Sequence, residues 1–358
     1  MSEEPASTSD EPMSSVPFDG RVFPGKRSYR TKDPLGRMIE IPENPGDNFA
    51  YFTLTDGESI RSYYDRKGYV VVRGLIDRSE CDRAHAAFLR EVKPSSSFIY
   101  RQATANPERH VYTAEGHMLN SILNVQSLDP KLFPEFRKLG TEIVTSAALQ
   151  AVLRMLFDEP GKLVQSMYFE GNPATWPHQD SYYLDSEHIG AMTAAWFAVE
   201  DIKPGAGRFF VYPKSHLFDM ARNGGDFDVA FNHARYKDLV KRVIEEQGFE
   251  CRAPALGKGD VLFWNGKTIH GSLETPEPQF SRRSFTGHYI PESHRFLQFQ
   301  SRIKPLNVKP LNGMNVHHPK DLTLFKNRAV FAVETNFPKS FLFAKRLMIK
   351  AVTSRPAA

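Results

Sequence analysis

The sequence predicts a mainly β fold with flanking helices. Short segments rich in Val, Ile, Phe and Tyr, bounded by Gly, Pro and Asn, are typical of strands and recur along the chain. Several other segments space their apolar residues as amphipathic helices do. The 358 residues are 41% hydrophobic and include 27 phenylalanines, which is enough apolar material for a sizeable core.

The first 57 residues have the composition of a tail and an arm. Residues 1–16 are rich in Ser, Glu and Pro and carry four acidic residues and no basic one, so we expect them to be disordered. Residues 17–57 contain many Gly and Pro residues and are expected to form an extended arm. A short helix over 58–67 then leads into a strand over 69–73.

Two further helices are expected in the first half. The segment 79–92 has helical spacing, and Asp77 or Ser79 can cap its start. The longest helical pattern runs over about 132–157, followed by a strand over 163–169.

The later half reads as paired strands. Residues 261–264 form a strand, Asn265-Gly266 a tight turn, and 268–272 the returning strand of a β-hairpin that carries His270. The next strand covers 282–290.

His178-Gln179-Asp180, together with the distant His270, predicts a metal site. On an extended strand positions 178 and 180 point to the same side, so both side chains can reach one ion. One carboxylate and two imidazoles occupy a face of Fe(II) and leave three positions open, which suits a bidentate 2-oxo acid and O2. This is the only His-x-Asp among the 12 histidines. We expect His288 to be a core residue or a support for the site, not a ligand.

The residues after His270 suit a 2-oxo acid. Arg282 can bind the distal carboxylate of such an acid through two parallel hydrogen bonds, which a lysine cannot reproduce. Ser272 shares the face of His270 and can donate to the same carboxylate. Arg283 points to the opposite face of its strand.

These motifs, with the opening Tyr-Tyr-Asp-Arg-Lys-Gly-Tyr-Val-Val-Val of residues 63–72, resemble the phytanoyl-CoA dioxygenase family of Fe(II)/2-oxoglutarate-dependent oxygenases over about 58–295. The resemblance implies a double-stranded β-helix (jelly roll, cupin-like) over 58–300. It places His178, Asp180 and His270 on iron, with Arg282 on 2-oxoglutarate and Gln165 near that co-substrate. Ala206 and Lys214 depart from the family pattern, and Lys214 is expected near the site entrance.

The resemblance also implies the reaction. With 2-oxoglutarate and O2 as co-substrates, it releases succinate and CO2 and hydroxylates an unactivated C–H bond of a small organic substrate. Desaturation, epoxidation or ring closure in natural-product biosynthesis are alternative outcomes, and Asp180 argues against halogenation. A non-catalytic jelly-roll metal-binding protein and a cupin-type metal enzyme are the alternatives from other classes. The substrate class stays open.

Aromatic residues and one insertion surround this site in the sequence. Trp176, Tyr182, Tyr183 and Trp264 either shape the substrate pocket or pack the barrel. The charged segment 217–251, with a helical pattern over 236–247, is interpreted as a lid on the barrel, and a plain surface excursion is the alternative.

Residues 301–358 form a basic extension with eleven Lys or Arg and two acidic residues. Residues 338–350 permit a basic amphipathic helix, which we expect to pack on the barrel, peripheral contact with an anionic membrane being the alternative. No nucleic-acid motif accompanies the charge. Two cysteines and the absence of an apolar stretch of membrane-spanning length favour a cytoplasmic protein. The oligomeric state stays open.

Overall fold

The computed structural model describes residues 27–341, 343–344 and 347, apart from 49, 172, 219, 221–228 and 301. The tail expected over 1–16 lies outside these residues. Within the described part of the chain, no helix is long and apolar enough to cross a membrane.

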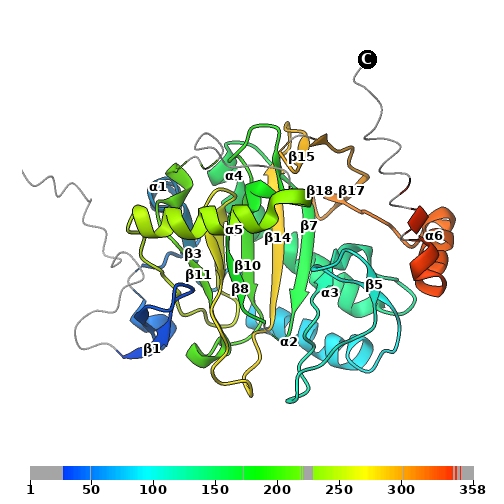
Figure 1. The fold of residues 1–358 in the computed structure, drawn as a ribbon, viewed down its shortest axis with the longest axis horizontal. Helices are drawn as coiled ribbons and strands as arrows, with labels where there is room; N and C mark the ends of the chain where they lie inside the picture. Colours follow the sequence, from blue (N-terminus) through cyan, green and yellow to red (C-terminus); the bar gives the residue numbers. More distant parts are fainter. Residues whose placement is uncertain are drawn as a thin grey trace, which may run out of the picture.

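Two sheets build the centre of the molecule (Figure 1). The larger sheet has the order β17 (Val308–Leu311), β18 (Met314–His317), β7 (Gly161–Phe169), β14 (Ser284–Pro291), β10 (Thr193–Ala198), β12 (Val261–Asn265) and β3 (Tyr69–Val72), and β6 (Ile122–Leu123) also pairs with β7. Its strands are antiparallel except where β18 runs parallel to β7. The smaller sheet has the order β11 (Phe209–Val211), β13 (His270–Ser272) and β8 (Thr175–His178).

The middle strands of the larger sheet are buried on both faces. Every residue of β14 is buried. Phe285 faces the helices, where its ring lies 5.8 Å from that of Phe136 and 4.9 Å from that of Tyr168, centroid to centroid. Thr286 and His288 alternate with it and line the cavity on the opposite face, as the two-residue period of a strand requires. Helices on one side and the smaller sheet on the other therefore enclose this sheet.

The helices bear out most of the expected pattern. They are α1 (Gly57–Lys67), α2 (Arg78–Ala87), which continues into a π-helical turn over Phe88–Val92, α3 (Pro134–Val144), α4 (Ala147–Phe157), α5 (Val229–Glu246) and α6 (Phe325–Asn336). The cap of α2 is Asp77, whose side chain accepts the backbone N–H of Ser79. The prediction of one helix over 132–157 was wrong, because the Ser146 side chain accepts the N–H of Leu149 and starts a new helix there.

The hairpin predicted over 261–272 was also wrong. β12 pairs with β10 and β3, whereas β13 pairs with β11 and β8 in the other sheet. The turn between them is held on the carbonyl of Gly68, which accepts the backbone N–H of Asn265 at 2.9 Å and the hydroxyl of Thr268 at 2.6 Å. Since the turn is fixed there, the chain leaves the larger sheet and His270 enters the smaller one.

The remaining elements lie around the two sheets. Part of the expected arm is a hairpin of β1 (Ser28–Lys32) and β2 (Met38–Pro42). The buried Arg208 donates to the carbonyls of Pro42, the last residue of β2, and of Glu43. The other strands are β4 (Ile99–Tyr100), β5 (Pro107–Glu108), β9 (Leu184–Ser186), β15 (Phe296–Gln298) and β16 (Arg302–Ile303).

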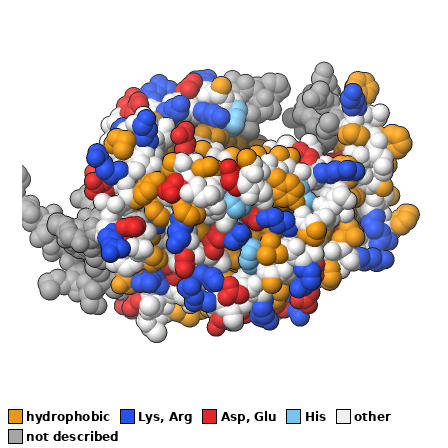
Figure 2. Space-filling view, turned by 90° about the horizontal axis from the view of Figure 1, so that it is seen from below, with side chains coloured by type: hydrophobic (Ala, Val, Ile, Leu, Met, Phe, Trp, Pro, Cys, Tyr) orange, Lys and Arg blue, Asp and Glu red, His pale blue; other side chains and the backbone are white. Residues whose placement is uncertain are grey.

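The C-terminal segment departs from the expected packing. α6 contacts the body through Phe331, whose ring lies 5.4 Å from that of Tyr100, and through Glu334, which accepts from the Tyr100 hydroxyl at 2.7 Å. Phe337 and Phe343 are 63% and 65% exposed, so they do not pack on the barrel. Figure 2 shows hydrophobic and basic side chains together at the surface of this end of the molecule. Part of the helix expected over 338–350 lies outside the described residues.

Candidate metal centre and co-substrate site

A cavity of about 560 Å³ lies between the two sheets. The larger sheet contributes Trp264, Thr286 and His288 to its wall, and the smaller sheet contributes His178 and His270. The cavity volume is in the range of small-molecule sites.

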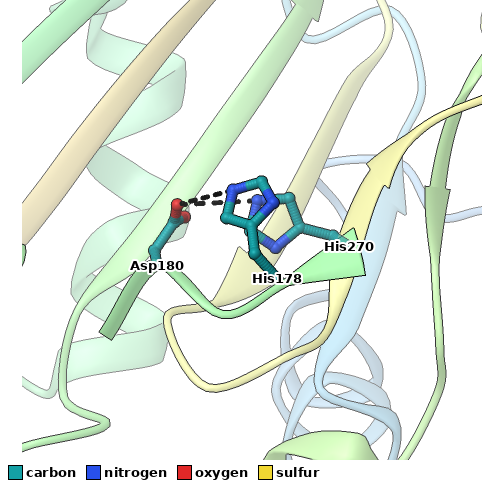
Figure 3. A group of neighbouring side chains, drawn as sticks. All are labelled: His178, Asp180 and His270. Atoms are coloured by element: carbon teal, nitrogen blue, oxygen red, sulfur yellow. Dashed lines mark ion pairs between the residues drawn. The ribbon is translucent and has the colours of Figure 1, made fainter. Parts of the chain in front are cut away.

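His178, Asp180 and His270 meet at this wall (Figure 3). One possible ligand atom from each lies within 4.8 Å of the other two. The Oδ1 atom of Asp180 is 3.7 Å from Nε2 of His178 and 3.5 Å from Nε2 of His270. The structure thus brings together the three residues that the sequence singled out.

The backbone conformation that brings Asp180 to His178 differs from the expected strand. β8 ends at His178, and Asp180 is the first residue of a 3-10 turn, Asp180–Tyr182, not part of the strand. Between them the Gln179 side chain donates to the carbonyl of Lys267 at 2.5 Å. The two side chains converge because the chain turns, so the strand-parity argument was wrong for this pair.

Both histidines are oriented in the same way. Nδ1 of His178 lies 2.9 Å from the carbonyl of Trp176, and Nδ1 of His270 lies 2.9 Å from the carbonyl of Thr268. A carbonyl only accepts, so each Nδ1 carries the proton and each Nε2 presents a lone pair towards Asp180. Burial lowers the pKa of His270 to about 4 and also lowers the pKa of His178, which keeps both rings neutral. Neutral imidazole is the form that ligates metals.

The second oxygen of Asp180 is held by two residues of the larger sheet. Oδ2 accepts the indole N–H of Trp264 at 2.8 Å and lies 3.3 Å from Nε2 of His288. Burial raises the pKa of Asp180, but His270, His288 and His178 outweigh it and hold that pKa below its usual range. His288 therefore supports the site, as one of the two expectations had it.

A small residue makes room for this arrangement. Ala194 of β10 lies directly between Trp264 of β12 and His288 of β14 in the sheet. These two strands flank β10, so the backbones of Trp264 and His288 are about 10 Å apart. A methyl group at position 194 leaves space above the sheet in which both rings reach the same carboxylate. Sequence patterns along one strand cannot reveal such a row.

Arg282 is a buried cation at the cavity. It is 2% exposed, Nη1 donates to the carbonyl of Gly207 at 2.8 Å, and within the described part of the chain Nε has no hydrogen-bond partner. Among the described residues no carboxylate pairs with it, and burial lowers its pKa to about 9. Ser272 lines the same cavity and is 6% exposed. A buried guanidinium without a counter-ion fits an anionic ligand.

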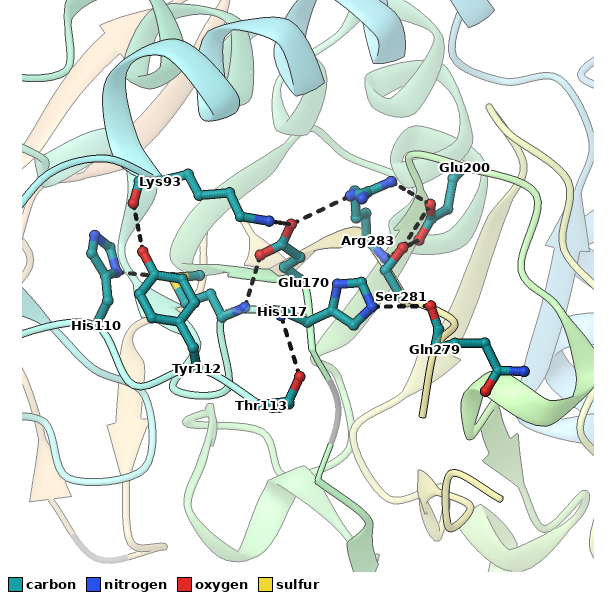
Figure 4. Close-up of polar contacts among 11 residues, drawn as sticks. Lys93, His110, Tyr112, Thr113, His117, Glu170, Glu200, Gln279, Ser281 and Arg283 are labelled. Atoms are coloured by element: carbon teal, nitrogen blue, oxygen red, sulfur yellow. Dashed lines mark hydrogen bonds and ion pairs between the residues drawn. The ribbon is translucent and has the colours of Figure 1, made fainter. Parts of the chain in front are cut away.

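The neighbour of Arg282 anchors the opposite face (Figure 4). Arg283 donates to Glu200 at 2.7 Å and lies 3.7 Å from the buried Glu170. Glu170 also accepts from Lys93 at 2.9 Å, and its backbone carbonyl accepts the N–H of Arg282. This network fixes the backbone from which Arg282 projects, and β14 begins just beyond it, at Ser284.

The other expected site residues divide into two groups. Gln165, Trp176, Tyr183 and Trp264 line the cavity. Tyr182 does not line the cavity, because it is 1% exposed and its ring stacks on that of Tyr236 of α5, with centroids 3.4 Å apart. Its assignment to the substrate pocket was wrong.

α5 of the segment 217–251 lies across the front of the sheets in Figure 1. Its His233 lines the cavity, with Nε2 2.7 Å from the hydroxyl of Tyr183. Its Lys237 ammonium lies 4.8 Å from the ring centre of Trp176. Lys214, in contrast, is not among the cavity-lining residues, and it has a φ of 70°.

Facing sheets around a cavity with a His-Asp-His group and a buried arginine define the class of jelly-roll oxygenases that use Fe(II) and 2-oxoglutarate. The sequence model of the phytanoyl-CoA dioxygenase family matches residues 64–284, more than half of the chain. The chain belongs to this family and is an Fe(II)- and 2-oxoglutarate-dependent oxygenase.

Relatives and solved structures agree with this. Mouse peroxisomal phytanoyl-CoA dioxygenase is 24% identical over 243 residues, which cover 64% of this chain and 67% of the mouse protein. The phytanoyl-CoA dioxygenase domain-containing protein 1 homolog of Caenorhabditis elegans is 24% identical over 274 residues, covering 64% and 90%. The structure of SnoN, a non-heme alpha-ketoglutarate-dependent epimerase from nogalamycin biosynthesis, has a TM-score of 0.51 at 16% identity and covers 74% of this chain and 99% of its own. That likeness confirms the predicted jelly roll.

Proposed function

We propose that His178, Asp180 and His270 hold Fe(II), that Arg282 and Ser272 bind the distal carboxylate of 2-oxoglutarate, and that the enzyme hydroxylates an unactivated C–H bond of a small organic substrate. The observation that carries this proposal is the buried guanidinium of Arg282, which pairs with no carboxylate of the described residues and lies in the same cavity as the three ligand candidates. Gln165, on the same wall, is proposed to contact the co-substrate.

The donor set fits Fe(II). Two neutral imidazole nitrogens and one carboxylate oxygen are the 2-His-1-carboxylate set of non-haem Fe(II) oxygenases. Each histidine is fixed by a backbone carbonyl and Asp180 by Trp264, so the ligands are oriented without rearrangement.

When bound, iron with 2-oxoglutarate and O2 supplies the oxidising power for C–H cleavage, with succinate and CO2 as products. The protein residues do the rest. Arg282 fixes the co-substrate, and Trp196 and Phe209 line the same cavity as apolar walls that limit water. Hydroxylation follows if the substrate C–H bond is held facing the iron, and a changed position favours desaturation, epoxidation or ring closure.

We further propose that α5 acts as the lid that influences substrate choice. His233 and Lys237 reach cavity residues, which supports a covering role over a plain surface excursion. The organisation proposed is an arm over 17–57, an oxygenase domain over 58–300 with this insertion, and a basic extension over 301–358. Two free, buried cysteines support a cytoplasmic location.

Succinate formation tests the function. Purified protein loaded anaerobically with Fe(II) and then given 2-oxoglutarate and O2 should produce succinate, and His270→Ala should not. Product analysis after screening a metabolite panel identifies hydroxylation by the gain of one oxygen atom. A wild-type protein that binds Fe(II) but yields no succinate with any candidate substrate would support the non-catalytic alternative.

A further inference from the structure

A second cavity adjoins the proposed active site. Its volume is about 450 Å³, and four residues belong to the walls of both cavities: Ala105, Leu123, Gln165 and Gln298. We refer to it as the side chamber. At about 30 Å³ for each water in the liquid, it has room for about fifteen heavy atoms.

A bulge in β7 opens the chamber towards the proposed iron site. Leu163 pairs with Tyr289 and Gln165 with His288, so Val164 is an extra residue opposite His288. Two successive residues at a bulge project to similar sides of a strand. Val164 and Gln165 both line the side chamber, and Gln165 also lines the active-site cavity.

Most of the side-chamber wall is apolar. Five aromatic rings line it, together with aliphatic side chains: Phe98, Tyr100, Phe133, Phe296 and Phe331, with Ile99, Leu123, Leu128, Leu132, Val164 and Leu322. Such a wall gains free energy by burying hydrocarbon.

Two polar groups on this wall lack partners. His317 is 5% exposed, and among the described residues its buried Nε2 has no hydrogen-bond partner. Its Nδ1 lies 3.0 Å from the backbone N–H of Asn307 and 3.2 Å from the carbonyl of the same residue. We assign Nδ1 as the acceptor of the nearer group, the N–H, so that Nε2 carries the proton and is an unused donor. Burial lowers the pKa of His317 to about 4, and the charge of the nearby Lys304 lowers it as well. Among the described residues Lys304 has no carboxylate partner.

The other charged side chains of the wall are already engaged. Lys320 lies 3.5 Å from Glu334 and 3.8 Å from the ring centre of Tyr100. Asp129 accepts the backbone N–H of Lys131 at 2.8 Å. The groups of this wall that remain available to a ligand are therefore a hydrogen-bond donor, Nε2 of His317, and a cation, Lys304.

We propose that the side chamber binds the non-reacting part of the substrate: an apolar body of about fifteen heavy atoms that ends in an anionic group held by Lys304 and His317. Gln165 and Leu123 mark the passage through which the rest of the molecule reaches the iron. That this ligand is the substrate rests on the proposed oxygenase function. The chamber thus selects an elongated, amphipathic anion.

Decanoate and its neutral counterpart decanol are the probes. Calorimetric titration into the metal-free full chain should detect decanoate, with affinity increasing about fourfold per methylene from octanoate to dodecanoate. Lys304→Met should weaken decanoate about tenfold and leave decanol unchanged. Lys326→Met, on the exposed face of α6, is the matched control and should leave both unchanged.

A filling substitution tests the location. Leu132 lies on the chamber wall and is 50% exposed, so the Leu132→Trp variant should fold. Its larger ring should abolish the increase of affinity with the chain length of the fatty acid. Leu217→Trp, at a 68% exposed position elsewhere, is the control and should keep that increase. Affinity that is independent of chain length, or a Leu132→Trp variant that binds like the wild type, overturns the apolar site. If Lys304→Met weakens the binding of decanoate and decanol equally, the proposal that Lys304 holds an anionic group is wrong.

Failure of this inference is distinguishable from failure of the proposed function. Binding is measured without iron, whereas succinate formation requires it. Normal succinate formation without decanoate binding contradicts the side-chamber proposal alone. Normal decanoate binding to a protein that never forms succinate contradicts the oxygenase proposal alone.

Discussion

Replacing Trp264 with phenylalanine tests how far the support of Asp180 determines metal binding. The substitution removes the indole N–H that donates to Oδ2 at 2.8 Å and leaves His288 as the other contact of that oxygen. A phenyl ring still fills most of the space against Phe209 and His270, whose ring centres lie 4.8 and 4.9 Å from that of Trp264.

The expected loss of metal affinity follows from the type of hydrogen bond that Trp264 makes with Asp180. A hydrogen bond to a buried charged group contributes about 1.5 to 3 kcal/mol, which corresponds to metal binding weaker by roughly 10- to 150-fold. Residues that orient metal ligands elsewhere have effects of about 10- to 100-fold. The loss of packing is small by comparison, so metal affinity should change more than the melting temperature of the metal-free protein.

Anaerobic calorimetric titration with Co(II), an oxidation-resistant substitute for Fe(II), measures this. Trp196→Phe is the matched control, because Trp196 lines the same cavity and its ring lies 5.9 Å from the guanidinium of Arg282 instead of contacting Asp180. Trp196→Phe should leave Co(II) affinity intact. Equal Co(II) affinity in Trp264→Phe and wild type would refute the proposed orienting role.

Three further predictions concern the same site. Alanine at position 178, 180 or 270 should abolish both stoichiometric Fe(II) binding and oxidation, and wild-type turnover in any of these variants contradicts the ligand assignment. Arg282→Lys should raise the 2-oxoglutarate concentration for half-maximal rate by the equivalent of about 1.5 to 3 kcal/mol with metal binding intact. Arg283→Lys, on the other face, should mainly lower the melting temperature. If instead Arg283→Lys changed the 2-oxoglutarate requirement and Arg282→Lys the melting temperature, the roles assigned to the two arginines would be reversed. In the metal-free protein, the folded pKa of His270 is about 4 against an ordinary 6.5, so its contribution to stability is complete above pH 6.5 and is lost as the pH falls through 4. Urea unfolding between pH 7 and 4 should show this decline, with a smaller slope in His270→Gln, and an identical slope would remove His270 as its source.

Local patterns were enough for many elements. The segments expected as α1, β3, β7 and β14 form at nearly the expected positions, because spacing along one element reports which face is buried. The same period places Arg282 with Thr286 and His288 on the cavity side and Arg283 on the other. The identities of the His-x-Asp residues and of His270 were also evident from chemistry alone.

Other features depend on partners distant in the sequence. The turn after β12 resembles a hairpin turn, but its anchoring on Gly68 sends His270 into the other sheet. The break at Ser146 needed a cap geometry that competes with helical periodicity. Tyr182 was assigned to the pocket with packing as the alternative, and stacking on α5 removes it from the cavity.

By itself the sequence determined the metal chemistry, since a carboxylate, two imidazoles and an arginine are recognisable wherever they lie. Only the tertiary structure decided how Asp180 is held and what adjoins the site. Trp264, Ala194 and His288 belong to three strands that pair across the larger sheet, and the side chamber is walled by segments from residue 97 to residue 331. Cross-strand rows and cavities are set by which strands pair and how long-range side chains pack, and a one-dimensional period does not contain that information.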